Sequence, residues 1–340
     1  METGTYRIVE GQYLRDILDQ PRALAATLEH LQIPKELMPV RHKLQEGRIK
    51  RIVLTGMGAS FHALHPLFLW LNAHGYTAIA VETSELIHSL KRWLEPETLI
   101  VAVSQSGQSA EIIRLIEENK HRAPLVGVTN AAESLLATGA DVAMVTMAGK
   151  ESSVSCKTYV TALMALRILG EFLCGQDESE AREELAQAAP AVASYLDGWK
   201  DHVFQTVARL GEVRHLFLLG RGESLAACGA GALILKESVR VHAEGMSSAA
   251  FRHGPLEMVD GETFAVVFAG AESTKALQDR LAEDIRQAGG RTEWIASESN
   301  ASLRPILEIL PVQMMTLALA AEAGIEAGRF GRIAKITTTE

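Results

Sequence analysis

The chain of 340 residues has little of three things: basic charge, cysteine and long uninterrupted apolar runs. Its formal net charge of −9 argues against a general nucleic-acid partner, because phosphate backbones are bound by clustered lysine and arginine. A small phosphorylated ligand is still compatible with this charge, since oriented N–H groups and hydroxyls hold an anion locally.

Three cysteines, Cys156, Cys174 and Cys228, are an odd number without metal-ligand spacing, and they predict reduced core thiols in a reducing compartment. The N-terminal segment carries early acidic residues and no apolar signal core. The longest apolar candidate, 159–169, is interrupted by Arg167 and is too short to cross a bilayer. We therefore expect a cytoplasmic protein without membrane contact.

The chain nevertheless contains enough apolar residues, 47% of the total, for full-sized cores, and its length favours two domains. Strand-like and helix-like runs alternate after a helical stretch at 12–47, which predicts a doubly wound α/β fold with parallel sheets between helices. Ligands of such sheets sit outside the carboxyl ends of the strands. The strand-like runs of the first half are 51–55, 77–82, 99–103, 125–129 and 142–147.

A polar loop, Ser104-Gln105-Ser106-Gly107-Gln108-Ser109, separates the buried strand-like run at 99–103 from a helix with an apolar face. Unpaired N–H groups and the positive end of a helix dipole make such a position an anion site. A helix cap needs one serine, whereas this loop offers three hydroxyls and two amides. Phosphate binding is therefore favoured over simple capping.

A glycine-rich turn at 56–60 falls at the same predicted sheet edge. Its Gly-x-Gly lacks the third glycine of a dinucleotide site, and Glu82 is the one acidic residue near the expected place. A phosphosugar therefore fits Ser60 better than a dinucleotide does. In the serine-rich stretch 149–159, a helix N-cap is at least as good an interpretation as ligand contact.

The layout of residues 50–60 recurs at 214–224, a shift of 164 positions. The same shift carries Ser104, Gln105 and Ser106 onto Phe268, Ala269 and Gly270, so only the first half keeps the anion-binding side chains. We expect an N-terminal helical arm (1–47), a first domain (48–175), a connector helix (176–202) whose start is a charged surface segment, a second domain (203–325) and a C-terminal tail (326–340).

The stretch 235–260 has no evident counterpart in the first half and carries residues suited to proton transfer. Glu237 lies towards the end of an apolar helix, and His253 precedes Gly254-Pro255, which indicates a constrained loop. Taken singly, a surface carboxylate and a structural histidine are equally good interpretations. Together, beside a phosphate-binding domain, they favour acid–base chemistry.

The C-terminal stretch 332–340 is apolar for a tail and contains one lysine, Lys335. A docked tail with an outward lysine is one interpretation. The other is a lysine held in a closed site, where it forms an imine with a carbonyl.

These residues together resemble the tandem sugar isomerase (SIS) domain family, and most closely the isomerase half of glucosamine-6-phosphate synthases. The interval of 16 residues between Glu237 and His253 equals that of the family. The lysine near the C-terminus also matches the family. The resemblance runs nearly end to end and is carried by residues 58–60, 104–107, 236–237, 242–244, 252–256 and 334–335.

The resemblance implies an active site that works without a metal or an organic cofactor, on a hexosamine or hexose phosphate, in a homodimer. His253 would open the sugar ring from the neighbouring subunit, Glu237 would carry a proton between C1 and C2, and Lys335 would form a Schiff base. The implied phosphate ligands are Ser104, Gln105, Ser106 and Ser109, and the implied sugar contacts are Ser60, Val154 and Ser155.

Three departures bear on the direction of the reaction. Synthases of this type carry a glutaminase domain with an N-terminal cysteine, whereas this chain has Glu2 and no such domain before Leu14, so glutamine hydrolysis is not expected. Ala230 and Ile234 replace a glutamate and a lysine of the synthases, and Ala59 replaces a phosphate-binding threonine. We therefore expect release of ammonia: glucosamine 6-phosphate would give fructose 6-phosphate.

Two alternatives stay open. A fructosamine-phosphate deglycase, or a related phosphosugar isomerase of the same fold, would use the same residues on a different substrate. A phosphosugar-sensing protein without catalysis is less favoured, because residues 1–47 are short and acidic for a DNA-binding domain. The sequence does not distinguish the gluco from the galacto configuration.

Overall fold

The computed structural model describes residues 7–296, 300–332, 334–337 and 339. These residues divide into two compact units, which we name by their first strands. The β1 unit comprises 22–151, 156–189 and the described residues after 333, and the β6 unit comprises 7–21, 152–155 and the described residues of 190–332.

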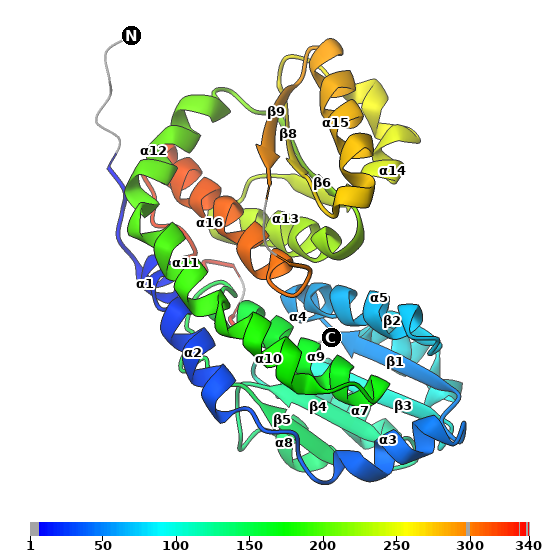
Figure 1. Cartoon of the computed structure of the whole chain (residues 1–340). Coiled ribbons are helices and arrows are strands. Elements are labelled where there is room, and N and C mark those ends of the chain that lie inside the picture. The colour runs from blue at the N-terminus through cyan, green and yellow to red at the C-terminus, as the bar shows by residue number, and fades with distance from the viewer. Residues whose placement is uncertain (1–6, 297–299, 333, 338, 340) are drawn as a thin grey trace. The chain divides into compact units, whose positions relative to one another are not determined.

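The β1 unit is built on a five-stranded, all-parallel sheet in the order β2-β1-β3-β4-β5 (Figure 1). Every residue of its central strand is buried, which confirms the prediction of a strand covered on both faces. The strands are β1 (Arg51–Gly56), β2 (Ala78–Glu82), β3 (Thr98–Ser104), β4 (Leu125–Thr129) and β5 (Val142–Val145).

Helices follow these strands as the alternating pattern predicts. Helix α7 (Ala110–Asn119) turns Ile112 and Leu115 into the core beneath β3, whereas Ile113 is only partly buried. The other helices with residues in this unit are α2 (Gln20–His30), α3 (Leu37–Gln45), α4 (Gly58–Ala63), α5 (His65–Ala73), α6 (Thr83–His88), a 3-10 turn (Lys91–Trp93), α8 (Leu135–Gly139), α9 (Lys157–Cys174) and α10 (Glu178–Ala186).

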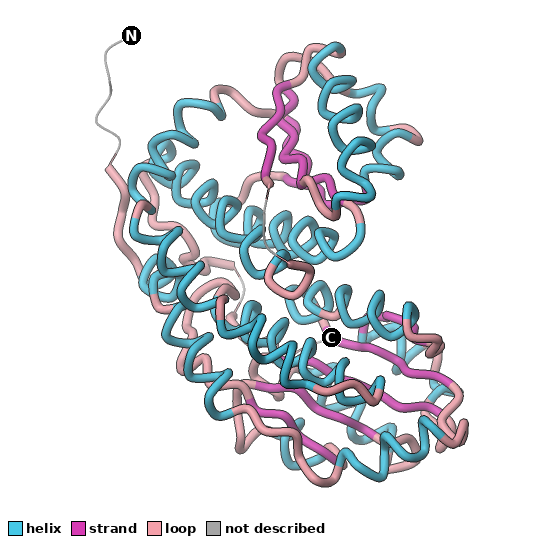
Figure 2. The backbone as a smooth tube through the Cα atoms, in the orientation of Figure 1, coloured by secondary structure: helices cyan, strands magenta, loops and turns pink. Residues whose placement is uncertain are grey.

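The β6 unit repeats this plan with four parallel strands in the order β7-β6-β8-β9, seen as the second group of strands in Figure 2. The strands are β6 (His215–Gly220), β7 (Ala243–Ser247), β8 (Thr263–Phe268) and β9 (Arg291–Ile295). Its helices are α1 (Gln12–Leu18), α11 (Ala188–Asp197), α12 (Trp199–Leu210), α13 (Leu225–Val239), α14 (Ser248–Arg252), α15 (Glu272–Gln287) and α16 (Arg304–Ala323), with 3-10 turns at Gly222–Ser224 and Pro255–Met258.

The strand registers correct two details of the predicted repeat. Thr55 pairs with Ala102, and Leu219, which lies 164 positions after Thr55, pairs with Val267, so the shift of 164 that relates β1 to β6 becomes 165 between β3 and β8. Ser104 therefore corresponds to Ala269 rather than to Phe268. The conclusion that the second half lacks the loop serines is unchanged.

The stretch 235–260 does have a counterpart in the first half, contrary to expectation. Strand β7 pairs with β6 in the way that β2 pairs with β1, and each of the two strands leads directly into a short helix, α14 or α6. The correspondence was missed because β7 contains glycine, serine and glutamate and does not show the β-branched residues that mark a strand.

Two further segments differ from the sequence interpretation. The charged segment after Gly175 forms a helix, α10, whose start is capped by the Asp177 side chain, because scattered charges on an exposed helix face are compatible with helix formation. Among the described residues, one helix, α16, is long and apolar enough to pass for a membrane span. This helix is longer than the apolar run 159–169, the longest candidate predicted from the sequence. Most of α16 is buried inside the protein, as for a core helix.

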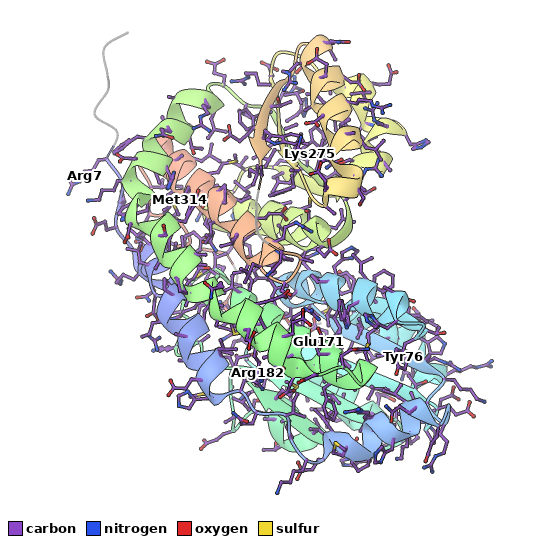
Figure 3. All side chains as sticks on the ribbon, viewed as in Figure 1. Arg7, Tyr76, Glu171, Arg182, Lys275 and Met314 are labelled. Carbon is purple, nitrogen blue, oxygen red and sulfur yellow. The ribbon has the colours of Figure 1, made fainter. Side chains whose placement is uncertain are left out.

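Each unit thus contains one long apolar helix, α9 or α16. Glu171 on α9 and Met314 on α16 are labelled in Figure 3. Glu171 forms an ion pair with Arg167, whose guanidinium lies 3.9 Å from the centre of the Trp70 ring. Of the three cysteines, all without disulfide bonds, Cys156 and Cys228 are buried as predicted and Cys174 is half-buried.

Candidate functional site

The predicted phosphate loop connects β3 to α7 in the β1 unit. Ser104 Oγ accepts a hydrogen bond from Gly107 N at 3.1 Å, and Ser106 Oγ accepts one from Gln108 N at 3.3 Å. Ser109 stands at the N-cap of α7, yet its side chain makes no capping hydrogen bond. The loop serines therefore do not act as helix caps, which removes the simplest structural explanation for them.

Backbone contacts hold this loop in one conformation. The carbonyl oxygen of Gln105 accepts a hydrogen bond from Asn130 N at 3.2 Å, and that of Gly107 accepts one from Leu136 N at 3.0 Å. Gly107 has φ +60°, and a Cβ atom there would lie 2.1 Å from Ser134 Oγ. Only glycine fits this position, because it tolerates positive φ and needs no space for a side chain.

Ser60 lies at the same sheet edge as the phosphate loop, as the sequence predicts. Gly56 at the end of β1 pairs with Val103 next to the end of β3, and Ser60 follows in α4 with a half-buried side chain. A Cβ atom on Gly56 would lie 2.9 Å from Val103 O, so the glycine allows the turn to pass close to β3.

The described part of the C-terminal tail contacts both this loop and a buried carboxylate. Thr337 O accepts a hydrogen bond from Ala110 N, the first residue of α7, at 3.1 Å. Lys335 Nζ lies 3.1 Å from Glu151 Oε2, and the Lys335 side chain is only 21% exposed. The tail is therefore docked with its lysine turned inward, rather than outward as the simpler interpretation had it.

Glu151 is the residue of this region that the sequence interpretation missed. Its side chain is fully buried and accepts hydrogen bonds from Cys156 N, Thr158 N and Thr158 Oγ1 in addition to Lys335. Its position, as the one acid in a serine- and threonine-rich stretch before a buried helix, could have drawn attention to it.

The remaining predicted residues belong to the β6 unit. Glu237 is half-buried in the last turn of α13, and His253 is exposed at the C-cap of α14, before Gly254 with φ +152°. Val154 is buried and Ser155 half-buried in the segment 152–155. The structure thus gathers Ser60, the phosphate loop and Lys335 in one unit, and Glu237, His253, Val154 and Ser155 in the other.

The serine of the second glycine-rich turn has a different environment from Ser60. Ser224 is fully buried and donates its hydroxyl to Glu308 Oε1 of α16 at 2.9 Å. Burial raises the pKa of Glu308 to about 8, and this effect outweighs the opposing effects of the Ser224 hydrogen bond and of Arg304. Ser224 is therefore engaged within the core, and a glutamate inside an apolar helix was the available indication of this contact.

The side chains offer little for a resident metal ion. Among the residues that the structure describes, no three His, Cys, Asp or Glu side chains gather as a potential metal site. A pocket of about 480 Å³ opens beside the end of α13 and is lined by Val9, Ser238, Arg240, Gly324, Ile325, Glu326 and Arg329.

Comparison with known proteins places this geometry in a family. The glutamine–fructose-6-phosphate aminotransferase (isomerizing) of Pyrococcus horikoshii is 30% identical over 360 residues, which include all of this chain and 59% of that protein. The enzyme of the same name from Pyrobaculum aerophilum is 28% identical and is matched over 57% of its length. The chain therefore spans less than two thirds of the length of these curated relatives.

Solved structures show the same fold. The C-terminal domain of glucosamine-fructose-6-phosphate aminotransferase from Francisella tularensis superposes with a TM-score of 0.85, covering 94% of this chain and 98% of that one at 21% identity. A glucosamine-6-phosphate deaminase from Thermotoga maritima gives a TM-score of 0.78, covering 97% of this chain and 100% of that one at 18% identity. The model of the SIS domain matches residues 48–171 and again residues 209–322, and the chain belongs to the SIS domain family.

Proposed function

We propose that this chain is an aminosugar-phosphate deaminase-isomerase, which converts glucosamine 6-phosphate and water into fructose 6-phosphate and ammonia. The curated relatives are named as fructose-6-phosphate aminotransferases, and one structural neighbour is named as a glucosamine-6-phosphate deaminase. The first name contains fructose 6-phosphate and the second glucosamine 6-phosphate, which are the product and the substrate of the proposed reaction, and they support a phosphosugar isomerase of the SIS fold as the broader assignment.

The observation that carries the choice of direction is the apolar face of α13. Ala230 and Ile234 precede Glu237 by seven and three residues, so all three share one face of the helix, and the first two are fully buried. The synthases that this chain resembles have a glutamate and a lysine at these two places. A site without these charged groups retains one carboxylate for proton transfer, which suffices for isomerisation and ammonia release.

In the proposed mechanism the loop after β3 binds the phosphate, and Glu237 of the second domain transfers the proton. Ser104, Gln105, Ser106 and Ser109 hold the phosphate at the end of β3, where loop hydroxyls and the start of α7 favour an anion. Ser60, Val154 and Ser155 contact the sugar.

Glu237 takes the proton from C2 of the open-chain amino sugar and returns it at C1, while a proton passes from the C2 amine to the C1 oxygen, which leaves a hydroxyl at C1 and an imine at C2. Lys335 Nζ attacks that carbon and releases ammonia. Water then hydrolyses the lysine imine to the ketone, and the amine is regenerated.

The proposal includes a homodimer in the cytoplasm, with His253 of one copy opening the ring in the site of the other. The exposure of His253 supports this role, because a side chain that serves a neighbouring subunit must lie at the surface of its own chain. Ring opening requires a proton donor and acceptor near neutral pH, which histidine supplies.

The test is release of ammonia and of ketose phosphate from a panel of phosphorylated sugars: glucosamine 6-phosphate, galactosamine 6-phosphate and a fructose-lysine phosphate. We expect turnover of a hexosamine phosphate by the wild type and its loss in Glu237→Gln. Turnover of the fructose-lysine phosphate alone would assign the deglycase reaction instead. Thermal stabilisation by these sugars without any product would assign a sensor, and either result would overturn the proposal.

A further inference from the structure

The surroundings of Glu151 are built for a fixed negative charge. Oε1 accepts hydrogen bonds from Cys156 N at 3.0 Å and Thr158 N at 3.1 Å, and Oε2 accepts one from Thr158 Oγ1 at 2.6 Å. These partners are donors, which suits an ionised carboxylate, because that group only accepts. The acid is therefore held rigidly by the start of α9 before any partner from the tail is considered.

Lys335 supplies the positive charge that faces this carboxylate. Its Nζ lies 3.1 Å from Oε2, and the Glu151 side chain is fully buried. Removing one member of such a pair is costly, because the other charge stays buried without compensation. The ion pair with Glu151 thus helps to fix the position of Nζ.

A second contact ties this lysine to the phosphate loop. Thr337 O is bonded to Ala110 N, the residue after Ser109, and two residues of extended chain span at most about 7 Å. The tail therefore lies between the carboxylate of Glu151 and the start of α7. The backbone of Lys335 is thereby held near the start of α7, next to the loop that is proposed to bind the phosphate.

We propose that Glu151 is a positioning residue for the lysine of the reaction: it fixes Nζ beside the phosphate loop and serves as the counter-ion of the nitrogen throughout imine formation. This inference rests on the proposed function, since it concerns the same reaction.

The balance of the imine step shows why a permanent counter-ion suits it. As a net change, a lysine ammonium and a ketone give a protonated imine and water: Nζ first gives up one proton, which frees the lone pair that bonds to C2, and it loses a second as the imine forms, so that both hydrogens leave in the water with the carbonyl oxygen. In the release of ammonia, the same ammonium exchanges with the imine of the substrate and ammonia departs. In both cases the nitrogen carries a positive charge before and after the step, so a carboxylate at 3.1 Å stabilises it at both ends.

Donors other than the lysine, from Cys156 and Thr158, already contact Glu151, so its role lies in charge and placement, and Glu237 remains the group that moves the carbon-bound proton. A merely structural role for Glu151 would affect the whole loop before α9 and, with it, sugar binding. A structural role predicts that sugar binding and imine formation are lost together. A positioning role predicts that imine formation is lost while binding is kept.

The experiment traps the imine with borohydride in the presence of fructose 6-phosphate and quantifies the adduct on Lys335 by peptide mass spectrometry. Glucitol 6-phosphate, which has no carbonyl group, reports binding alone by calorimetry. We expect Glu151→Gln to lower the adduct at least fivefold while glucitol 6-phosphate binds within threefold of wild type. Glu151→Asp keeps the negative charge but places it one methylene further from Nζ, so it should also lower the amount of adduct. This variant replaces Glu151→Gln in the experiment if Glu151→Gln does not fold.

A matched variant completes the design. Glu97→Gln removes an exposed carboxylate that lies 2.7 Å from Lys50 in the same unit. It should form the adduct at a level within twofold of wild type.

The outcomes separate this inference from the proposed function. An adduct that falls less than fivefold in Glu151→Gln overturns the inference, and so does a parallel loss of glucitol 6-phosphate binding. A wild type that releases ammonia but forms no adduct overturns the inference and leaves the proposed function standing. A Glu151-dependent adduct in a chain that releases no ammonia from any hexosamine phosphate supports the inference and overturns the proposed function.

Discussion

The two SIS domains share a strand order and a glycine-rich turn, but they use the serine of that turn in opposite ways. Ser60 in the first domain is half-buried at the sheet edge. Ser224 in the second is fully buried and donates to Glu308. One carboxylate, brought in by α16, is thus enough to convert a turn suited to ligand contact into a part of the core.

The loops after the central strands differ in the same direction. The loop between β3 and α7 has five residues, 105–109, whereas the loop between β8 and α15 has three, 269–271. The shorter loop has no hydroxyl side chain. The second domain thus keeps the scaffold without the hydroxyl side chains proposed to bind phosphate, and its helix α13 and the C-cap of α14 carry Glu237 and His253.

The largest expected effect concerns the second domain. Glu237→Gln should lower kcat by roughly 100- to 10,000-fold with little change in KM, because an amide cannot accept the proton from carbon. The measurement is steady-state release of ammonia from glucosamine 6-phosphate. Glu272→Gln, an exposed carboxylate at the start of α15 in the same unit, is the control and should retain wild-type turnover. Equal activity of the two variants would remove Glu237 from the mechanism.

A second prediction sharpens the contrast in the cores. The raised pKa of Glu308 means that the folded protein binds more protons than the unfolded chain between about pH 4.5 and pH 8. The free energy of unfolding should therefore fall as pH rises through this window and level off above it. The glutamine side chain in Glu308→Gln does not titrate. This variant should therefore abolish the loss in the free energy of unfolding across this window, which is on the order of 4 kcal/mol in the wild type.

Urea denaturation at pH 5 and pH 8 measures this effect. Glu171→Gln is the matched variant in the other long helix, where the carboxylate is paired with Arg167, and it should lower stability at both pH values because the guanidinium loses its partner. A pH dependence that survives in Glu308→Gln would show that another group is responsible.

The third prediction compares the glycines of the two loops. Gly107→Ala introduces a side chain at φ +60° and a clash with Ser134 Oγ, and it should destabilise the protein by about 3 kcal/mol. Gly270→Ala has a similar φ of +67°, but its nearest neighbours lie at 3.6 Å, so backbone strain alone should cost about 1 kcal/mol. Thermal melts of both single variants and of the double variant Gly107→Ala/Ser134→Ala measure these losses of stability. Equal losses for Gly107→Ala and Gly270→Ala would show that loop packing is not tighter in the first domain.

Much of the fold follows from the sequence, because buried parallel strands consist of continuous apolar runs such as those of β1, β3, β6 and β8. Edge strand β7 escaped prediction because a half-exposed strand needs no such run. The one-residue shift between β3 and β8 was also invisible, since register depends on pairing with β1 and β6 rather than on composition.

In the candidate site too, contiguous sequence patterns could be predicted and contacts between distant residues could not. The polar loop between β3 and α7 could be predicted because its polar residues are contiguous between a strand and a helix, and phosphate binding by this loop stays a prediction. The partners of Lys335 and Ser224 could not, because Glu151 lies 184 residues from the lysine and Glu308 lies 84 residues from the serine. Such contacts arise from tertiary packing, and no local pattern encodes them.

The division of labour between the two domains is tested most directly by calorimetric titration of glucitol 6-phosphate into three proteins: wild type, Ser106→Ala and Glu237→Gln. Loss of one hydrogen bond to a charged phosphate should weaken binding to Ser106→Ala about tenfold. Glu237→Gln should bind within threefold of wild type, since its role begins after binding. Unchanged binding in Ser106→Ala, together with a tenfold loss in Glu237→Gln, would contradict the assignment of binding to the first domain and proton transfer to the second.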